Sequence, residues 1–325
     1  MSTATEPFIR FEPIYQTRVW GGRTLETRFG RLLPDREAPF GESWEISARD
    51  EADSLVEGGR FGGKTLSQLW SDPDSRAAVF GEKAPDADRF PLLCKILDAR
   101  ERLSLQVHPP AEVAAELGGE PKTEVWYVAH AEPNAVIYAG LREGVTEDRF
   151  REALEQGTAE ECVHAIPTET GDHIFIPSGR LHAIGAGLTI YEIQQNSDTT
   201  YRVYDWNRVG LDGKPRRLHV EESLKCIDFD DVEPTMDAPK DALLTECEHF
   251  RIEEHGLQPG DDIQTTTAGR FAIVTVVMGA VTSTAVPPEV DTFREGDFFI
   301  VPAGADASTL QAEEYVELLL TTWPE

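Results

Sequence analysis

The sequence predicts a mainly all-β fold, with two jelly-roll β-barrels and a few short helices. Short runs rich in Val, Ile, Phe and Tyr recur along the 325 residues, for example EVWYVA, LTIYEIQ, TYRVYDW and FAIVTVV, and glycines and prolines separate them. Two stretches have a helical pattern, and one strand and turn pattern occurs twice. Short strands with frequent turn residues are typical of sandwiches and barrels, and the repeat indicates two units of one plan.

Two stretches have the composition of helices. TLSQLWSDPDSRAAVFG (residues 65–81) contains Pro73 in its middle, so we expect only short turns there. TEDRFREALEQGT (residues 146–158) begins with Thr146, continues with two acidic residues and reaches Gly157. This order is typical of a helix that is capped at its start and ends at a glycine.

The repeated pattern joins a turn, a strand and a second turn. TGDHIFIPSGRLHAIG (residues 170–185) and EGDFFIVPAGADASTL (residues 295–310) both read Gly-Asp, apolar residues, Pro, a small residue and Gly. The first copy has His182 after the last glycine, whereas the second has Ala307 at the same distance. The pattern resembles a signature of the cupins, small jelly-roll barrels that enclose a metal site. The resemblance implies that the first barrel holds a metal and that the second has lost a ligand.

We therefore expect two domains. Residues 1–235 would form a catalytic, metal-binding cupin domain with an N-terminal extension and short helices, and residues 236–325 a degenerate cupin domain without metal ligands. Near this boundary, DFDDVEPTMDAPKD (residues 228–241) is acidic, contains two prolines and is typical of a linker.

Charge and composition exclude several classes of partner. The chain has 59 acidic residues against 30 lysines and arginines, a net charge of −29, so it repels nucleic acid and anionic membranes. No run approaches the roughly 20 apolar residues of a membrane helix, and no secretory signal is visible. The four cysteines form no CxxC pair, so we expect neither disulfides nor a thiolate zinc site. We expect a cytoplasmic monomer or weak homodimer, in which an anionic substrate would require a local cluster of lysines and arginines.

A polar strand face lies in LSLQVHPP (residues 103–110). Side chains alternate along a strand with a period of two, so Ser104, Gln106 and His108 point to one side. Such a face either meets water or lines a pocket whose occupant prefers oxygen and nitrogen ligands. Taken alone, a strand histidine is more often a core or surface residue than a metal ligand.

Two more segments add side chains that can bind a metal. KTEVWYV presents Lys122 and Glu124 on one strand face, and PSGRLHAIG presents His182 beyond a tight turn. With Gln106 and His108 they form a set of one amide oxygen, one carboxylate and two imidazoles. This set suits Zn²⁺ better than Mn²⁺ or Fe²⁺. No local spacing such as HExxH joins the four ligands, which spread over about 75 residues.

Together, these segments resemble the type I phosphomannose isomerases in their compact prokaryotic form, a family of metal-dependent cupins. The segments occur in the family's order and cover most of the first 220 residues or so, whereas the C-terminal region matches only as a degenerate cupin. They are RVWGG (18–22), GESWEIS (41–47), FPLLCKILDARERLSLQVHPP (90–110), KTEVWYV (122–128), IPSGRLHAIGAGLTIYEIQQNSDTTYRVYDWNR (176–208) and DGKPRRLH (212–219).

The resemblance implies a zinc-dependent aldose–ketose isomerase of carbohydrate metabolism. It would interconvert mannose 6-phosphate and fructose 6-phosphate through an enediol(ate), with one Zn²⁺ per chain. The residues that occupy the family's ligand positions are Gln106, His108, Glu124 and His182.

The resemblance also implies roles on the substrate side. Arg202 takes the place of an active-site arginine, and Glu192 that of a nearby acid. Lys214 falls near a substrate-side lysine of the family, although its loop is spaced differently here. The expected contacts to the sugar phosphate are Ser104, Lys95, Lys122 and, more weakly, Lys214.

Aldose–ketose isomerisation requires a base, a group that stabilises negative charge on oxygen, and cations for the phosphate. The base is open between a buried Glu192, Lys122 with a pKa lowered by neighbouring cations, and a hydroxide on the metal. The catalytic residues that we expect are Arg202, Glu192 and Lys122. Zn²⁺ and Arg202 would stabilise the enediolate.

Other functions of a cupin stay open. A cupin isomerase for another hexose or hexose phosphate would keep the fold, and a non-catalytic, metal-containing, sugar-binding cupin would not need the three catalytic residues together. A cupin dioxygenase prefers a set of ligands richer in histidine. We expect His173 to be a packing or edge residue. The histidines that we expect at the surface or in loops are His130, His164, His219, His249 and His255.

Overall fold

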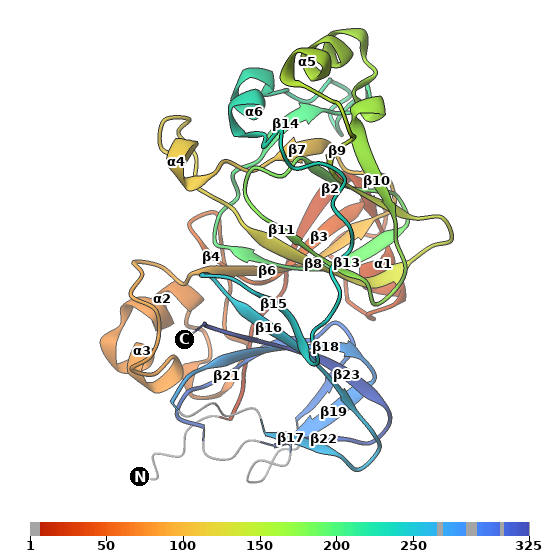
Figure 1. Ribbon diagram of the computed structural model, residues 1–325. Helices are drawn as coiled ribbons and strands as arrows, with labels where there is room; N and C mark the ends of the chain where they lie inside the picture. Colours follow the sequence, from red (N-terminus) through yellow and green to blue (C-terminus); the bar gives the residue numbers. More distant parts are fainter. Residues whose placement is uncertain (1–6, 265–268, 284–290, 306–308, 325) are drawn as a thin grey trace. The chain divides into compact units, whose positions relative to one another are not determined.

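The computed structural model describes residues 7–264, 269–283, 291–305 and 309–324. Strands dominate the structure and the helices are short, which confirms the predicted fold class (Figure 1). The chain divides into two compact units. Unit one consists of Met1–Ile14, Trp44–Leu93 and Ala238–Glu325, and unit two of Tyr15–Ser43 and Cys94–Asp237.

Two sheets form the body of unit two. Their strand orders are β11-β8-β13-β6-β2-β3 and β10-β9-β12-β7-β14. The strands are β2 (Ile14–Gly22), β3 (Phe40–Ile46), β6 (Leu92–Ala99), β7 (Leu105–Val107), β8 (Glu124–Ala131), β9 (Val136–Leu141), β10 (Val163–Pro167), β11 (His173–Ile176), β12 (His182–Ile184), β13 (Leu188–Gln195) and β14 (Tyr201–Tyr204). Trp126 and Ile190 of the first sheet and Ile137 and Ile184 of the second belong to one buried apolar cluster, so the sheets pack as a sandwich.

Short helices cover the outer face of the second sheet. Phe150 of α5 (Glu147–Gln156) and Leu224 of α6 (Val220–Cys226) pack on Leu105 and Val203. Helix α5 confirms the prediction, because the Thr146 side chain accepts a hydrogen bond from the amide of Arg149 and Gly157 is left-handed. The remaining helices of this unit are α1 (Thr24–Thr27), α4 (Ala111–Ala114) and the 3₁₀-helix Ala159–Cys162.

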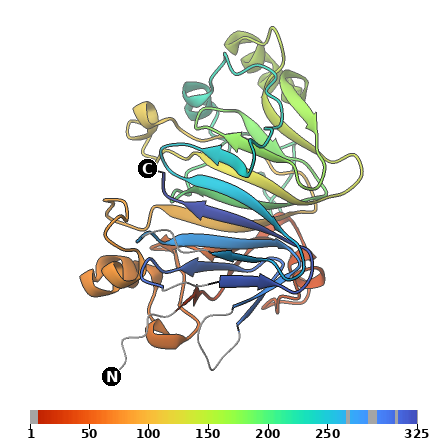
Figure 2. The same cartoon turned by 60° about the horizontal axis from the view of Figure 1, so that its bottom comes forward.

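Unit one has a second β-sandwich. A six-stranded sheet of order β1-β21-β18-β23-β16-β15 and a four-stranded sheet of order β17-β22-β19-β20 enclose Val274, Phe299, Val281 and Leu310. The strands of the C-terminal segment are blue in Figure 2 and several of them lie side by side there. The strands are β1 (Ile9–Arg10), β15 (Leu243–Glu246), β16 (Arg251–Leu257), β17 (Asp262–Gln264), β18 (Ala272–Met278), β19 (Ala280–Ser283), β20 (Thr292–Arg294), β21 (Phe298–Val301), β22 (Thr309–Ala312) and β23 (Val316–Thr322). A small hairpin of β4 (Ala48–Arg49) and β5 (Ala52–Asp53), the 3₁₀-helix Gly59–Phe61 and two α-helices also belong to this unit.

The segment with Pro73 forms two helices, so the prediction of turns is wrong there. Helix α2 (Leu66–Ser71) has a capping box, and α3 (Pro73–Val79) begins at the proline itself. Asp72 separates the two helices, and its side chain accepts hydrogen bonds from the amides of Asp74 and Ser75. A proline at the first helical position loses no hydrogen bond, which is why it starts a helix here.

The repeated motif has the same backbone plan in both units. Gly171 and Gly296 have φ values of 92° and 86°, in the left-handed region that favours glycine. The carboxylate of Asp172 accepts from the amide of Glu169 and that of Asp297 from the amide of Arg294, both at 2.7 Å. Strands β11 and β21 then follow and pair antiparallel with β8 and β18. The second copy continues to Ala307, which lies outside the described residues.

The acidic segment 228–241 contains the boundary between the units, after Asp237. Its first part is attached to unit two. Asp231 forms a two-pronged ion pair with Arg180 at 2.9 Å, and Met236 packs on the core of the sandwich. The carboxylate of Asp237 accepts a hydrogen bond from the amide of Phe175. The segment is therefore held in place up to the boundary.

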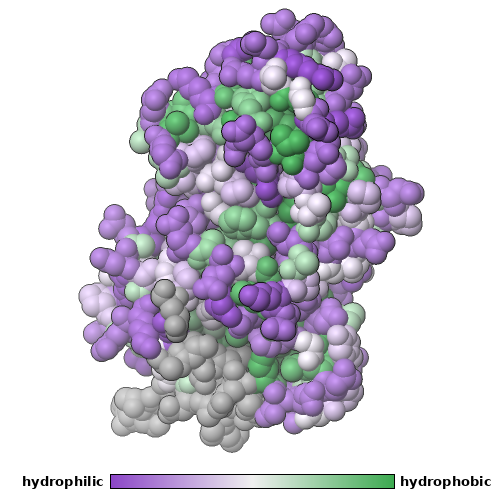
Figure 3. Space-filling model, in the orientation of Figure 1, coloured by the Kyte–Doolittle hydropathy of each residue, from purple (hydrophilic) through white to green (hydrophobic). Residues whose placement is uncertain are grey.

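The surface reflects the composition. The face seen in Figure 3 is mainly hydrophilic, with smaller apolar areas between the polar ones. Among the described residues, no helix is both long and apolar enough to cross a membrane.

Candidate active site

Three buried side chains of unit two converge on one point. His108 follows β7, Glu124 begins β8, and His182 begins β12, and in the described part of the chain their ligand atoms lie within 4.8 Å of one another. Nε2 of His108 lies 3.5 Å from Oε2 of Glu124, and Nε2 of His182 lies 3.6 Å from Oε1. Pairing between β12 and β7 places His182 opposite Gln106, which brings the distant segments together.

Hydrogen bonds orient both imidazoles. Nδ1 of His108 lies 2.9 Å from the carbonyl oxygen of Thr199, and Nδ1 of His182 lies 2.8 Å from that of Arg180. Because a carbonyl only accepts, each Nδ1 carries the proton and each Nε2 presents a lone pair toward Glu124. Burial and the neighbouring His108 lower the pKa of His182 to about 3, and burial and Lys122 lower the pKa of His108.

The triad has the properties of a metal site. Among the described residues, Nε2 of His108 and Oε1 of Glu124 are buried without a hydrogen-bond partner, and Oε2 of Glu124 forms an ion pair with Lys122 at 3.0 Å. Burial alone would raise the pKa of Glu124, but Lys122 and His108 hold it well below its ordinary value. Two neutral imidazole nitrogens and an ionised carboxylate fit a divalent transition metal.

Gln106 lies beside this group. Its Nε2 is 3.3 Å from Nε2 of His182. Rotation of the amide by half a turn about its last bond would present an oxygen at the same place. The structure therefore brings together all four side chains that the sequence places at the metal.

A row of buried charged side chains extends from the group of His108, Glu124 and His182. Nζ of Lys122 lies 3.0 Å from Glu124 and 3.9 Å from Glu192, and Nζ of Lys95 lies 3.2 Å from Glu192. Trp126 donates a 2.9 Å hydrogen bond to the other oxygen of Glu192. Burial would lower the pKa of Lys122, but the two carboxylates raise it above its ordinary value. This direction is opposite to the one that a basic Lys122 would require.

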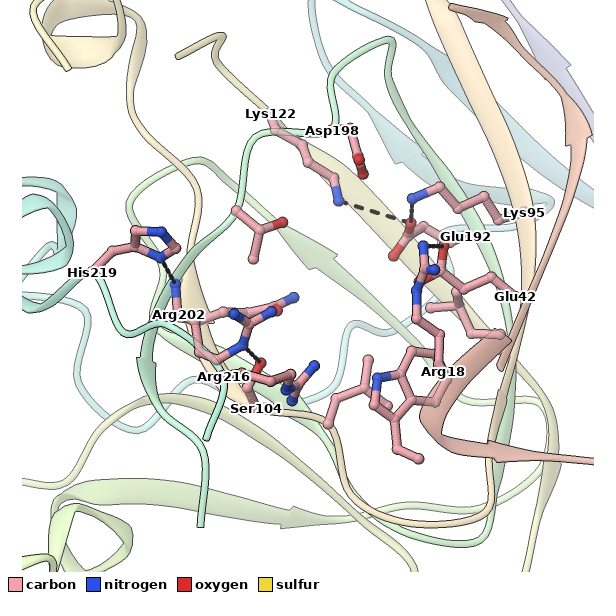
Figure 4. Close-up of a pocket in the computed structure, with 15 residues that line it drawn as sticks. Arg18, Glu42, Lys95, Ser104, Lys122, Glu192, Asp198, Arg202, Arg216 and His219 are labelled. Atoms are coloured by element: carbon pink, nitrogen blue, oxygen red, sulfur yellow. Dashed lines mark hydrogen bonds and ion pairs between the residues drawn. The ribbon is translucent and has the colours of Figure 1, made fainter. Parts of the chain in front are cut away.

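A pocket of about 320 Å³ lies beside these charges. Within the described residues, five cationic side chains and three carboxylates line it, so it is locally cationic in a strongly acidic protein. Figure 4 shows Arg202, Arg216 and Ser104 grouped together, whereas Lys95 and Lys122 point toward Glu192. The lining residues are Arg18, Trp20, Glu42, Lys95, Leu97, Leu103, Ser104, Gln106, Lys122, Glu192, Asp198, Thr200, Arg202, Arg216 and His219.

Arg202 reaches the pocket from β14. Its Nε donates to Oγ of Ser104 at 3.2 Å, and its Nη1 donates to the carbonyl oxygen of Arg217 at 3.1 Å. Burial and the neighbouring cation Arg216 lower the pKa of Arg202 to about 10, although Asp205 partly opposes them. The guanidinium of Arg202 therefore keeps its charge at neutral pH. The negative charges around it do not fully balance the effects of burial and of Arg216.

Lys214 is the one predicted site residue that lies apart. It is exposed in the loop before α6 and does not line the pocket, whereas Arg216, two residues later, does. An irregular loop has no regular periodicity, so residue spacing does not indicate which side chains point into the pocket. The sequence therefore identified the loop but not the residue that lines the pocket.

Other lining residues carried no assigned role in the sequence. Arg18 and Glu42 form an ion pair at 2.7 Å and belong to the motifs RVWGG and GESWEIS, so the motifs contained a signal for them.

The histidine predictions have different outcomes. The sequence predicts His219 at the surface or in a loop, but it lines the pocket, and its Nδ1 accepts a hydrogen bond from the amide of Arg202 at 3.3 Å. His173 is buried on the edge strand β11, as expected.

Comparisons with known proteins agree with this geometry. A model of the catalytic domain of type I phosphomannose isomerase matches residues 8–120. The mannose-6-phosphate isomerase ManA of Bacillus subtilis is 33% identical over 329 residues, which cover 98% of this chain and 99% of that protein.

Solved structures agree as well. The crystal structure of the mannose 6-phosphate isomerase from Bacillus subtilis has a TM-score of 0.85 and 31% identity, and covers 97% of this chain and 99% of that one. A zinc-bound mannose 6-phosphate isomerase shares the fold, with a TM-score of 0.74 and 16% identity over 97% of this chain and 99% of that one. With its fold, its buried His-Glu-His group and its similarity over nearly the whole length, the chain belongs to the type I phosphomannose isomerase family.

Proposed function

We propose that this protein interconverts mannose 6-phosphate and fructose 6-phosphate as a Zn²⁺-dependent isomerase with one metal ion per chain. The observation that carries the proposal is the buried group of His108, Glu124 and His182, which contacts a cationic pocket through Gln106 and Lys122. The similarity to a mannose-6-phosphate isomerase over nearly the whole chain supports the same substrate.

The metal would be held by Gln106, His108, Glu124 and His182. Nitrogen and oxygen donors of this kind suit Zn²⁺, and the zinc-bound structure with the same fold supports this metal. When bound, the ion supplies a Lewis acid that favours negative charge on the substrate oxygens.

The reaction would move a proton between C2 and C1 of the open-chain sugar through an enediol(ate). We assign the base to Glu192, because it lines the pocket and Trp126 and Lys95 hold both ends of its carboxylate. Glu192 would take the proton from C2 and return it to C1. Lys122, a cation beside Glu192, would donate hydrogen bonds to the oxygens on C1 and C2 as charge develops there, whereas Arg202 would hold the substrate at a position away from the reacting carbons.

The remaining predictions concern binding and organisation. Ser104, Lys95 and Lys122 line the pocket and would contact the sugar phosphate, whereas the exposed Lys214 would not. The division into a catalytic domain (1–235) and a degenerate cupin (236–325), the monomeric or weakly dimeric state and the cytoplasmic location stay predictions.

A metal assay coupled to turnover tests the proposal. The purified protein should contain zinc, convert mannose 6-phosphate, lose the activity on chelation and regain it when Zn²⁺ is added. Activity that survives complete removal of metal would contradict the mechanism. A metal-containing protein without turnover would favour the sugar-binding cupin, and faster turnover of another hexose phosphate would change the substrate.

A further inference from the structure

We propose that Arg216, held in place by Asp205, forms with Arg202 and Ser104 a subsite for the phosphate group of the substrate. The inference rests on the proposed function and specifies which end of the pocket binds the anion. Arg216 would contact the phosphate, and Asp205 would act as a positioning residue.

The two lysines of the pocket already have carboxylate partners. Lys95 pairs with Glu192 at 3.2 Å and Lys122 with Glu124 at 3.0 Å, and all four side chains are buried. A phosphate dianion placed there would compete with these carboxylates and meet their repulsion. This end of the pocket is therefore close to neutral and suits the uncharged hydroxyls of a sugar.

The arginine end has an excess of positive charge. Asp205 accepts from Nε and Nη2 of Arg216 at 2.7 and 2.6 Å and from Nη2 of Arg208 at 2.8 Å. Arg202 forms no ion pair with a carboxylate of the described residues, and Arg208 also lies 3.9 Å from the exposed Glu101, so three guanidinium groups face two carboxylates. Positive charge is therefore in excess at this end of the pocket, which favours an anion such as a phosphate group. The lowered pKa of Arg202 has the same cause, since burial and the neighbouring cations disfavour its charge.

The existing hydrogen bonds leave donors for a ligand. Arg216 uses Nε and Nη2 for Asp205, and Arg202 uses Nε for Ser104 and Nη1 for the carbonyl of Arg217. Within the described residues, Nη1 of Arg216 and Nη2 of Arg202 have no such bond, and both side chains line the pocket (Figure 4). Two guanidinium groups and a hydroxyl are the donors that phosphate sites use.

The turn that carries Asp205 is unusual. The amide of Arg208 donates to the carbonyl of Asp205 at 2.9 Å, and the two residues between them, Trp206 and Asn207, have φ values of 54° and 56°. A left-handed tryptophan is strained, and such strain persists only where the surroundings impose it. Here Trp206 donates to the carbonyl of Leu103 at 2.6 Å, which fixes the turn beside Ser104.

The separation of the two ends suits the substrate. Ser104 lies four residues before His108, which on an extended chain is a displacement of roughly 13 Å. In a hexose 6-phosphate the reacting carbons, C1 and C2, lie at the opposite end from the phosphate on C6. Phosphate at the arginines would thus leave C1 and C2 near Glu192 and the metal-binding group.

Kinetics of single variants test the subsite. We would compare Arg216→Gln, Arg216→Lys and Asp205→Asn with the matched control Arg217→Gln, which removes one charge from a side chain that is 79% exposed in the same loop. Arg216→Gln should raise the KM for mannose 6-phosphate and the Ki for inorganic phosphate at least tenfold, with a much smaller change in kcat. Arg216→Lys and Asp205→Asn should raise both constants by intermediate factors, and Arg217→Gln by less than twofold.

Free mannose separates phosphate binding from general damage. The loss of kcat/KM in Arg216→Gln should be at least ten times larger for mannose 6-phosphate than for mannose. Equal losses, or an unchanged Ki for phosphate, would overturn the subsite. If thermal melting shows that Arg216→Gln is unfolded, the Lys and Asn variants decide by the same criteria. Should the wild type not convert mannose 6-phosphate, calorimetric binding of inorganic phosphate to wild type and variants decides the subsite independently of the proposed activity.

Discussion

Nζ of Lys122 lies 3.0 Å from Oε2 of Glu124, and both side chains are almost completely buried. The carboxylate of Glu124 thus faces a cation on one side and two imidazoles on the other. It balances the charge of Lys122 and at the same time is the only carboxylate of the metal-binding group in the described residues. Loss of its charge should therefore affect both stability and metal content.

Glu124→Gln should remove the bound metal and lower the free energy of unfolding by about 3 kcal/mol or more, because Lys122 is left as a buried charge without its closest partner. Metal analysis and denaturant unfolding would measure both effects. Glu155→Gln, an exposed substitution on α5, is the matched control and should change neither quantity. A Glu124→Gln protein with full metal content would contradict the ligand assignment.

Glu192→Gln tests the assigned base. The variant should abolish exchange of the C2 proton of mannose 6-phosphate with solvent, because a carboxamide cannot accept that proton. Its metal content should stay normal, since Glu192 is not in the metal-binding group. Proton exchange followed by NMR in deuterated water, with metal analysis of the same sample, gives both answers. Exchange at a near-normal rate would remove Glu192 from this role.

The two buried histidines predict how the stability of the metal-free protein depends on pH. Burial lowers the pKa of His182 to about 3 and also lowers that of His108, whereas both have ordinary values near 6.5 in the unfolded chain. Below pH 6.5 the unfolded chain therefore binds protons that the folded protein does not. The contribution of the two histidines to the free energy of unfolding is therefore fully present above pH 6.5. It declines as the pH falls toward the pKa values that the histidines have in the folded protein.

His182 should contribute a slope of about 1.4 kcal/mol per pH unit below pH 6, and His108 should add to the slope in the same direction. Denaturant unfolding of the chelated protein between pH 7 and pH 5 measures the slope. His182→Asn should lower the slope by about 1.4 kcal/mol per pH unit, which is the contribution of one proton. A flat stability profile in the wild type would contradict the assignment of neutral, buried imidazoles.

Gly21 tests the packing that positions the pocket strands β2 and β3. A Cβ atom at this position would lie 2.5 Å from the backbone carbon of Phe40 and 2.7 Å from Cα of Gly41. Because backbone cannot move aside as a side chain can, Gly21→Ala should cost about 1–3 kcal/mol of stability or more. Gly58→Ala, where a Cβ would meet no atom within 4 Å, should stay within about 0.5 kcal/mol of wild type. Equal unfolding midpoints for the two variants would contradict the close approach.

Much of the metal site could be predicted because strand alternation is a local property. Gln106 and His108 share a face by a period of two, and the turn at Gly179 precedes His182 in a recognisable pattern. The pairing of β12 with β7, which places His182 opposite Gln106, is a long-range event that only the resemblance to a known family could suggest.

Loops and helix starts limited the prediction elsewhere. The loop before α6 has no period, so Lys214 and Arg216 could not be distinguished from the sequence. His219 lies at the N-terminal cap of α6, where no alternation marks the direction of its side chain. Pro73 predicts a break by the rule for helix interiors, although a proline is also a good first residue of a helix. The grouping of residues 44–93 with the C-terminal strands depends on contacts between distant segments and leaves no trace in local patterns.

The composition of unit one from three separate segments has a consequence for protein synthesis. Residues 44–93 emerge from the ribosome well before residues 238–325, with which they form one compact unit. The side chains of Phe80 and Phe90 lack one of their aromatic partners until Phe271 has been translated. Unit two, complete at Asp237, can fold during that interval. Nascent chains stalled before Phe271 should therefore be the ones that chaperones bind.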